Sequence, residues 1–349
     1  MAGTLKVSKI TNDQGFAKGN LIPYAEAGDV GQGGRQFIYV VGGVEWVVHE
    51  FREDGMFWLP SNKACDIFMI GGGGSGGAAY GNNDTGEGGG GAGGALWRQG
   101  YTVTGGAYDI VIGHGGYSAT KGAGEDINHK TTMHNGGDTI AFNVYARGGG
   151  HGGASDNYNN AATGGCGGGA GARNSNSGWT TGRPSTQDSF TGWTSYGNSG
   201  GNSANGNYSG GGGGGIGGAG GNQSGGTNDS NSQAGSGGAG LNFSGYFGVT
   251  VGHFGWFGGG GGGGTYRHST NTMYQAPANA GGYGGGGNGV SAREGNQTDP
   301  NVYAANRING MNGTGGGGGG AVEDHENQEV GGAQHGRGGS GAVVIRYQL

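Results

Sequence analysis

Short runs of apolar residues, several of them alternating with polar ones, predict strands along this chain. The strand at 56–60 ends in Pro60, which suits a strand end or a sheet edge. In the stretch 95–116, the runs YTVT and YDIVI flank Gly105 and Gly106 and predict a hairpin. The other clear runs are WVVHEF at 46–51, ACDIFMI at 64–70, DTIAFNVYA at 138–146 and GAVVIRYQL at 341–349.

No segment predicts an α-helix. An apolar period of 3.6 residues never lasts three turns without several glycines, and each interior glycine costs about 1 kcal/mol relative to alanine. The strand at 341–349 ends the chain, so we expect it to close a domain begun much earlier. The predicted fold class is all-β, with short strands in a sheet or sandwich and essentially no helix.

Between the strands the chain passes through runs of glycine. Glycine supplies 101 of the 349 residues, against a usual share of about 7%. A glycine run has no side chain to bury, so only its backbone can stabilise it. Polyglycine-II helices, with three residues per turn and outward N–H and C=O groups, can pair with one another where no Cβ separates them. The runs lie at 71–77, 88–95, 148–154, 164–172, 210–221, 258–264, 281–289 and 315–320.

Two other glycine-rich classes fit poorly. Collagen needs a strict Gly-X-Y period, which the unbroken runs 71–74 and 258–264 exclude. A flexible linker predicts few bulky residues, yet the chain has 16 Tyr, 11 Phe and 6 Trp. Charged residues, which keep disordered chains open, make up only 11%. An ordered β/polyglycine-II fold is therefore favoured.

Charge and hydropathy exclude further classes. The formal net charge of −6 comes without long runs of one sign, whereas a nucleic-acid binder should present a basic stripe. No stretch approaches 18 apolar residues, so we expect no membrane insertion. The start MAGTLKVSKITNDQG lacks the apolar region of a secretory signal and predicts synthesis in a cytoplasm. The two cysteines, Cys65 and Cys166, could form one disulfide, but two free buried thiols are favoured.

Signals for chemistry are weak. The nearest histidine cluster is HKTTMH at 129–134, and the acidic stretch EDHENQE covers 323–329. Each is read first as a polar loop, with a metal site as the lesser alternative. GxGxxG matches occur by chance in so much glycine and lack a strand–helix unit. No triad order or carboxylate pair stands out, so we expect no enzyme, no cofactor and no bound metal.

The order of these pieces resembles a known family. HEFREDGMFWLP, ACDIFMIGGGGSGG, GGGGAGG, YTVTGGAYDIVIGHGG, GGDTIAFNVYARGGGHGG and GGSGAVVIRY follow one another as in the glycine-rich domain of phage tail-fibre and receptor-binding proteins. The glycine runs are similar to the polyglycine-II sandwich of T-even tail-fibre tip adhesins. The likeness covers roughly 46–154 and 315–349. It implies an adhesin that is assembled in the host cytoplasm, becomes part of the virion, and binds a bacterial outer-membrane protein or polysaccharide.

The resemblance also divides the chain. Residues 1–45, with TLKVSKI and RQFIYVVGGV as strand candidates, would attach to other tail-fibre or virion proteins or form a homotrimer. Residues 46–349 would form the glycine-rich domain. Its insertion at about 155–314 would hold the receptor-binding loops, because tip adhesins bind through variable loops between glycine runs. Monomer and homotrimer both stay open.

Aromatic residues in this insertion are the candidate receptor contacts. They lie among Asn, Ser, Thr and Gly, a chemistry typical of antibody paratopes. The alternative for each one is that it covers the glycine lattice. The candidates are Tyr158, Trp179, Trp193, Tyr196, Tyr208, Phe254, Trp256, Tyr266 and Tyr274.

Two other functions compete with the adhesin. A structural glycine-rich filament or surface protein would self-assemble through its edges and have bland loops. A carbohydrate- or ice-binding module would show a regular repeat with one small residue type on a face. Irregular spacing and aromatic loops count against both, and a depolymerase lacks an acidic pair.

Overall fold

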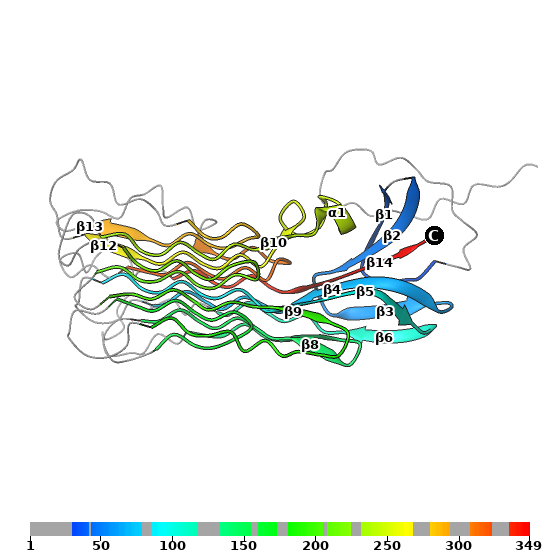
Figure 1. The fold of residues 1–349 in the computed structure, drawn as a ribbon, viewed down its shortest axis with the longest axis horizontal. Helices are drawn as coiled ribbons and strands as arrows, with labels where there is room; N and C mark the ends of the chain where they lie inside the picture. Colours follow the sequence, from blue (N-terminus) through cyan, green and yellow to red (C-terminus); the bar gives the residue numbers. More distant parts are fainter. Residues whose placement is uncertain are drawn as a thin grey trace, which may run out of the picture.

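The structure, a computed structural model, describes residues 30–41, 43–78, 85–117, 133–154, 160–172, 181–204, 208–224, 232–267, 280–293, 308–322 and 335–349. The molecule is elongated, with a β-sheet at one end and a bundle of extended glycine segments at the other (Figure 1). The fold is nearly all β, as predicted. The helix α1 (Ser244–Phe247) has four residues.

Six strands form the main sheet in the order β1-β2-β14-β4-β5-β9. The C-terminal strand β14 lies between β2 and β4 and is antiparallel to both, so the last residues close the centre of the sheet, as expected. The bounds are β1 Arg35–Val41, β2 Val44–Phe51, β4 Lys63–Ile70, β5 Ala95–Val103, β9 Thr194–Tyr196 and β14 Ala342–Gln348.

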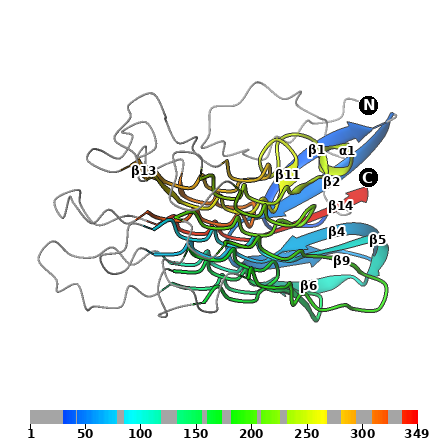
Figure 2. The ribbon, with the colours of Figure 1, turned by 60° about the vertical axis from the view of Figure 1, so that its left-hand side comes forward.

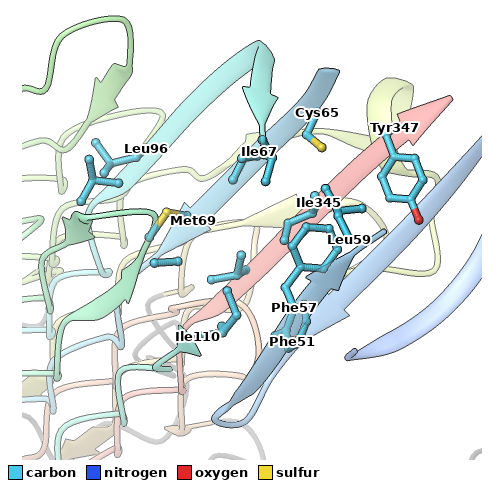
Figure 3. Close-up of a cluster of buried hydrophobic side chains, with 14 of the residues drawn as sticks. Phe51, Phe57, Leu59, Cys65, Ile67, Met69, Leu96, Ile110, Ile345 and Tyr347 are labelled. Carbon is cyan, nitrogen blue, oxygen red and sulfur yellow. The ribbon is translucent and has the colours of Figure 1, made fainter. Parts of the chain in front are cut away.

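Both faces of this sheet are buried. Alternate residues of each central strand point to opposite faces, so each strand contributes side chains to both. In β4, Ile67 and Met69 enter one apolar cluster while Phe68 and Ile70 enter another. Figure 3 shows the first cluster, covered by β3 (Gly55–Leu59), β6 (Gly106–Ile110), β7 (Thr139–Ala141) and β8 (Val144–Ala146). The second is covered from the segment 241–257, which contains β10 (Leu241–Asn242), α1 and β11 (Trp256–Phe257).

Two predictions about the strands are wrong. β5 and β6 do not form a hairpin with each other: β5 pairs with β4 and β9, and β6 pairs with β3. The chain crosses at Gly105 from the main sheet to its covering layer, so that both segments gain a buried face. The run 138–146 is not one strand but the hairpin β7–β8, with Phe142 and Asn143 at positive φ in its turn.

The predicted boundary at residue 45 does not separate two structural units. β1 pairs along its whole length with β2. Gly31 donates its amide hydrogen to the Tyr347 hydroxyl across 2.8 Å. The described residues from 30 onward therefore belong to the sheet, while TLKVSKI at 4–10 lies outside the described residues. β3 ends at Leu59, directly before Pro60, as expected.

The glycine runs lie side by side as a lattice, visible from two directions in Figures 1 and 2. In the run 86–94, Gly88, Gly91 and Gly94 all donate amide hydrogens to the segment 147–153, each across 2.8 Å. This return to the same neighbour at every third residue is the geometry of polyglycine II. The run is bonded in all to six segments: 71–77, 147–153, 166–172, 211–214, 261–264 and 315–321.

Only glycine fits at these positions. A Cβ on Gly90 would overlap the carbonyl oxygen of Gly74, and one on Gly89 would overlap that of Gly261. Two larger residues lie where the lattice meets the sheet: Cys166 and Ile216 are buried in the second apolar cluster. Backbone hydrogen bonds thus form the interior of one end of the molecule, and side chains form the other.

Candidate functional site

The lattice end opposite the sheet forms the other end of the elongated molecule (Figure 1). β12 (Thr265–Arg267) and β13 (Ser291–Arg293) lie there and pair in parallel. Isolated bridges join neighbouring chain ends, such as Gly86 with Val322 and Ser224 with Gln233. Nine stretches within 79–334 are bordered by lattice residues of this end, so nine connections between lattice segments start from it.

A small apolar cluster closes the lattice at this end. It consists of Tyr208, Tyr266, Val290, Ile308 and Val322. The Tyr208 and Tyr266 ring centroids are 6.0 Å apart. Beside them, the Ser209 and Ser232 hydroxyls lie 2.7 Å apart and share a hydrogen bond.

Two predicted contact residues are therefore anchors. Tyr266 is fully buried within β12, and Tyr208 is buried against it. Neither ring is available to a partner, which corrects their placement in exposed loops. The physical reason is that the end of a glycine lattice needs apolar side chains to cover the last backbone hydrogen bonds.

Trp193 and Tyr196 lie at the other end, against the main sheet. Trp193 packs on Tyr101 at a centroid distance of 6.2 Å, with the Arg98 guanidinium 5.9 Å from its ring. Tyr196 is in β9 and contacts Phe243 of the second apolar cluster. Burial raises the pKa of the Tyr196 hydroxyl. Both rings are half-buried packing residues rather than members of a lattice-end loop.

Phe254 and Trp256 form an exposed group with a residue that sequence reasoning missed. His253 and Trp256 exchange backbone hydrogen bonds across a two-residue turn made by Phe254 and Gly255. The Phe254 side chain is 70% exposed and that of Tyr283 is 73% exposed. The Trp256 and Tyr283 ring centroids are 5.9 Å apart. We name His253, Phe254, Trp256 and Tyr283 the aromatic patch. The sequence signal that could have identified Tyr283 is its position as a lone aromatic residue inside the run GGYGGGG.

The other three predicted contacts, Tyr158, Trp179 and Tyr274, lie outside the described residues. So do His129 and the acidic stretch 323–329. Across the described ranges, no group of three His, Cys, Asp or Glu residues is placed to hold a metal ion. In the same ranges, no helix is long and apolar enough to cross a membrane.

Three histidines influence one another along one side of the lattice. His335 is buried, and burial together with the charges of His134, Arg337 and His151 lowers its pKa to about 4. Burial also lowers the pKa of His151. His335 and His151 are therefore uncharged at pH 7.

The insertion at 155–314 is not a single loop in the described residues. Its segments 166–172, 211–214 and 261–264 are bonded directly to the run 86–94. The glycine runs inside the insertion thus complete the lattice, and only the connections between them are left as loop candidates.

The comparisons with known proteins agree with this architecture. The family model described as "Glycine-rich domain" matches residues 53–348. This range contains the covering layers, the lattice and the strands β4, β5, β9 and β14 of the main sheet, while β1 and β2 precede it. The search of curated proteins finds no matching relative. Because the family model covers most of its length, the chain belongs to the glycine-rich domain family.

Proposed function

We propose that the protein is a phage tail-fibre adhesin that recognises a bacterial cell-surface receptor during host adsorption. One observation supports this most: a lattice held by backbone hydrogen bonds anchors nine chain connections at a single end. Three of these connections contain Tyr158, Trp179 and Tyr274, in sequences rich in Asn, Ser and Thr. A scaffold that carries several connections rich in aromatic and small polar residues is the arrangement that paratopes use.

The mechanism would be binding without chemistry. A lattice in which each run is bonded to several neighbours holds the ends of each connection in fixed positions, so the lattice itself loses little conformational entropy when a connection binds. Several copies on one virion would multiply weak contacts by raising the effective concentration of the second binding event. No cofactor is needed for such recognition.

The test is labelling of a panel of bacterial strains with a fluorescent fusion of the whole chain. Deleting 155–314 would remove lattice segments, so the informative variant replaces residues 173–180 and 268–279 with Gly/Ser sequences of equal length. The control is Met56→Ala, an exposed position at the sheet end. We expect strain-selective labelling that the replacement abolishes and the control leaves unchanged.

A structural filament is the second candidate, and one observation favours it. β1 is an edge strand, no strand in the described ranges pairs with its outer side, and its sequence RQFIYVV has no proline and a single charge. Such edges promote pairing between chains. Filaments in electron micrographs of the purified protein, together with no labelling of any strain, would favour this function over the adhesin.

A further inference from the structure

We propose that Phe254 is a contact residue that inserts into an uncharged apolar pocket of a protein on the bacterial surface. This inference rests on the proposed function and goes beyond it. Phe254 lies in the segment 241–257, which covers the main sheet, so the aromatic patch around it is a contact surface separate from the connections at the lattice end. The inference also names the partner's class. It starts from a conflict between the backbone and the side chain at Phe254.

The turn at Phe254 has an unfavourable residue in its first central position. Phe254 has φ 53° and Gly255 has φ 84°, and two positive φ values define a type I′ turn, for which Asn-Gly is the preferred pair. A bulky residue is disfavoured in this left-handed conformation because its Cβ approaches the following carbonyl oxygen. The surrounding structure has to compensate for that strain.

Phe142 has the same conformation for a visible reason. It occupies the corresponding position of the β7–β8 turn with φ 51°. Its ring packs against Phe57, Tyr101 and Tyr108 in the first apolar cluster. Burial of the ring offsets the backbone strain there.

Phe254 lacks that compensation within the described residues. Its side chain is 70% exposed, and the ring contact found for it is His253 at a centroid distance of 5.2 Å. An exposed phenylalanine in a strained turn lowers stability without gaining burial. Persistent local strain of this kind is typical of functional positions.

The turn is also held rigidly. A Cβ on Gly255 would lie 2.5 Å from the Cβ of Ser244, and one on Gly252 would lie 2.6 Å from the Trp256 carbonyl oxygen. This close packing fixes the backbone on both sides of Phe254. The direction in which the Phe254 side chain leaves the backbone is therefore fixed, which reduces the entropy cost of binding.

The chemistry of the surface favours a neutral protein pocket. Residues 235–266 and 280–292 contain no Asp, Glu, Lys or Arg. Two arginines from the main sheet bond to the first of these segments, and both are paired with carboxylates. Arg35 donates to the Thr250 carbonyl oxygen and is paired with buried Glu50. Arg346 donates to the Tyr246 carbonyl oxygen and is paired with Asp66. A phenylalanine ring can stack on a sugar, but the two segments lack the charged side chains that commonly hydrogen-bond sugar hydroxyls. An apolar protein pocket needs no such groups and would remove the whole ring surface from water.

The test compares Phe254→Asn with the matched control Phe142→Asn in the fluorescent full-length fusion. Phe254→Asn creates the preferred Asn-Gly turn, so we expect an unchanged or higher melting temperature. It should also weaken labelling of susceptible cells by roughly 30-fold, the loss typical of an interface hot spot. Phe142→Asn should lower the melting temperature, since it removes a packed ring. Labelling by the wild type should depend little on salt and should disappear after proteinase K treatment of the cells.

Each contrary result is decisive. If Phe254→Asn melts as low as Phe142→Asn, Phe254 is a packing residue and the inference fails. If the variant labels cells like the wild type, the inference fails while the adhesin function stands. Labelling that resists protease but is lost after periodate oxidation would overturn the protein partner in favour of a polysaccharide. If the wild type labels no strain, the adhesin function fails and the partner assignment fails with it.

Discussion

Gly261 donates its amide hydrogen to the carbonyl oxygen of Gly90 across 2.9 Å, in the interior of the glycine lattice. A Cβ on Gly261 would overlap the carbonyl oxygen of Gly318, which belongs to backbone and has no flexible side chain to move. We therefore expect Gly261→Val to unfold the domain. Gly261→Ala should lower the free energy of unfolding by about 3 kcal/mol or more, as severe overpacking does.

Gly218→Ala is the matched control for that prediction. Gly218 lies in a similar run, but the nearest atom to its Cβ would be 3.8 Å away. This variant should change the free energy of unfolding by less than about 1 kcal/mol, with a gain from the stiffer unfolded chain. Urea unfolding of both variants measures the difference. Equal stability of wild type and Gly261→Ala would contradict the packed-helix lattice.

Stability should fall in mild acid because of His49. Its Nδ1 donates to the Gly33 carbonyl oxygen across 2.7 Å, and its Nε2 lies 3.1 Å from the Tyr347 hydroxyl. Burial lowers the pKa of His49 from 6.5 to about 4. As the pH falls, the unfolded chain is protonated first, so stability is complete above pH 6.5 and declines between pH 6.5 and about 4.

This pKa shift corresponds to a loss of about 3 kcal/mol in the free energy of unfolding over that pH range. His49→Gln keeps a donor and an acceptor but does not titrate, so its free energy of unfolding should depend less on pH. His114→Gln, at an exposed position, is the control. Because the pKa of His335 is also lowered to about 4, His49→Gln should retain a residual acid loss. Identical pH profiles for wild type and His49→Gln would refute the role of His49.

The two cysteines should be unreactive in the folded protein. Cys65 and Cys166 are both free and buried, as predicted, and burial raises the pKa of each thiol to about 12. The thiolate that attacks a disulfide reagent is thus almost absent at pH 8. A coloured disulfide reagent should titrate no thiol in native protein and two in denaturant. Rapid native reaction at either cysteine would show that its surroundings open.

Trp193→Ala should affect folding more than binding. The change removes the contacts with Tyr101 and Arg98, which are worth about 1 to 2 kcal/mol together. Thermal unfolding should reveal that loss, while Tyr283→Ala, at an exposed ring, should stay within about 0.5 kcal/mol of wild type. The packing role would be contradicted if Trp193→Ala melted like wild type yet no longer labelled cells.

Several features of the fold could be predicted from local pattern. The runs 46–51, 64–70 and 341–349 became β2, β4 and β14, because apolar, β-branched sequences favour strands wherever they are buried. Pairing was harder. β5 and β6 are adjacent in sequence, but each gained more by joining a different sheet, and nothing in YTVTGGAYDI encodes that choice. The turn at Phe142 and Asn143 likewise split one apparent strand, since only the tertiary packing of Phe142 offsets its positive φ.

The candidate site followed the same division. Aromatic residues in a glycine-rich chain were recognisable as either contacts or packing, but their sequences did not distinguish buried Tyr266 from exposed Phe254. The sequence by itself determined that the chain would form short strands and backbone-stabilised glycine helices, because residue type limits local conformation and close approach. Only the tertiary structure decided which runs are neighbours and which rings remain exposed, because each glycine helix can bond to any other and the assembled lattice alone selects its partners.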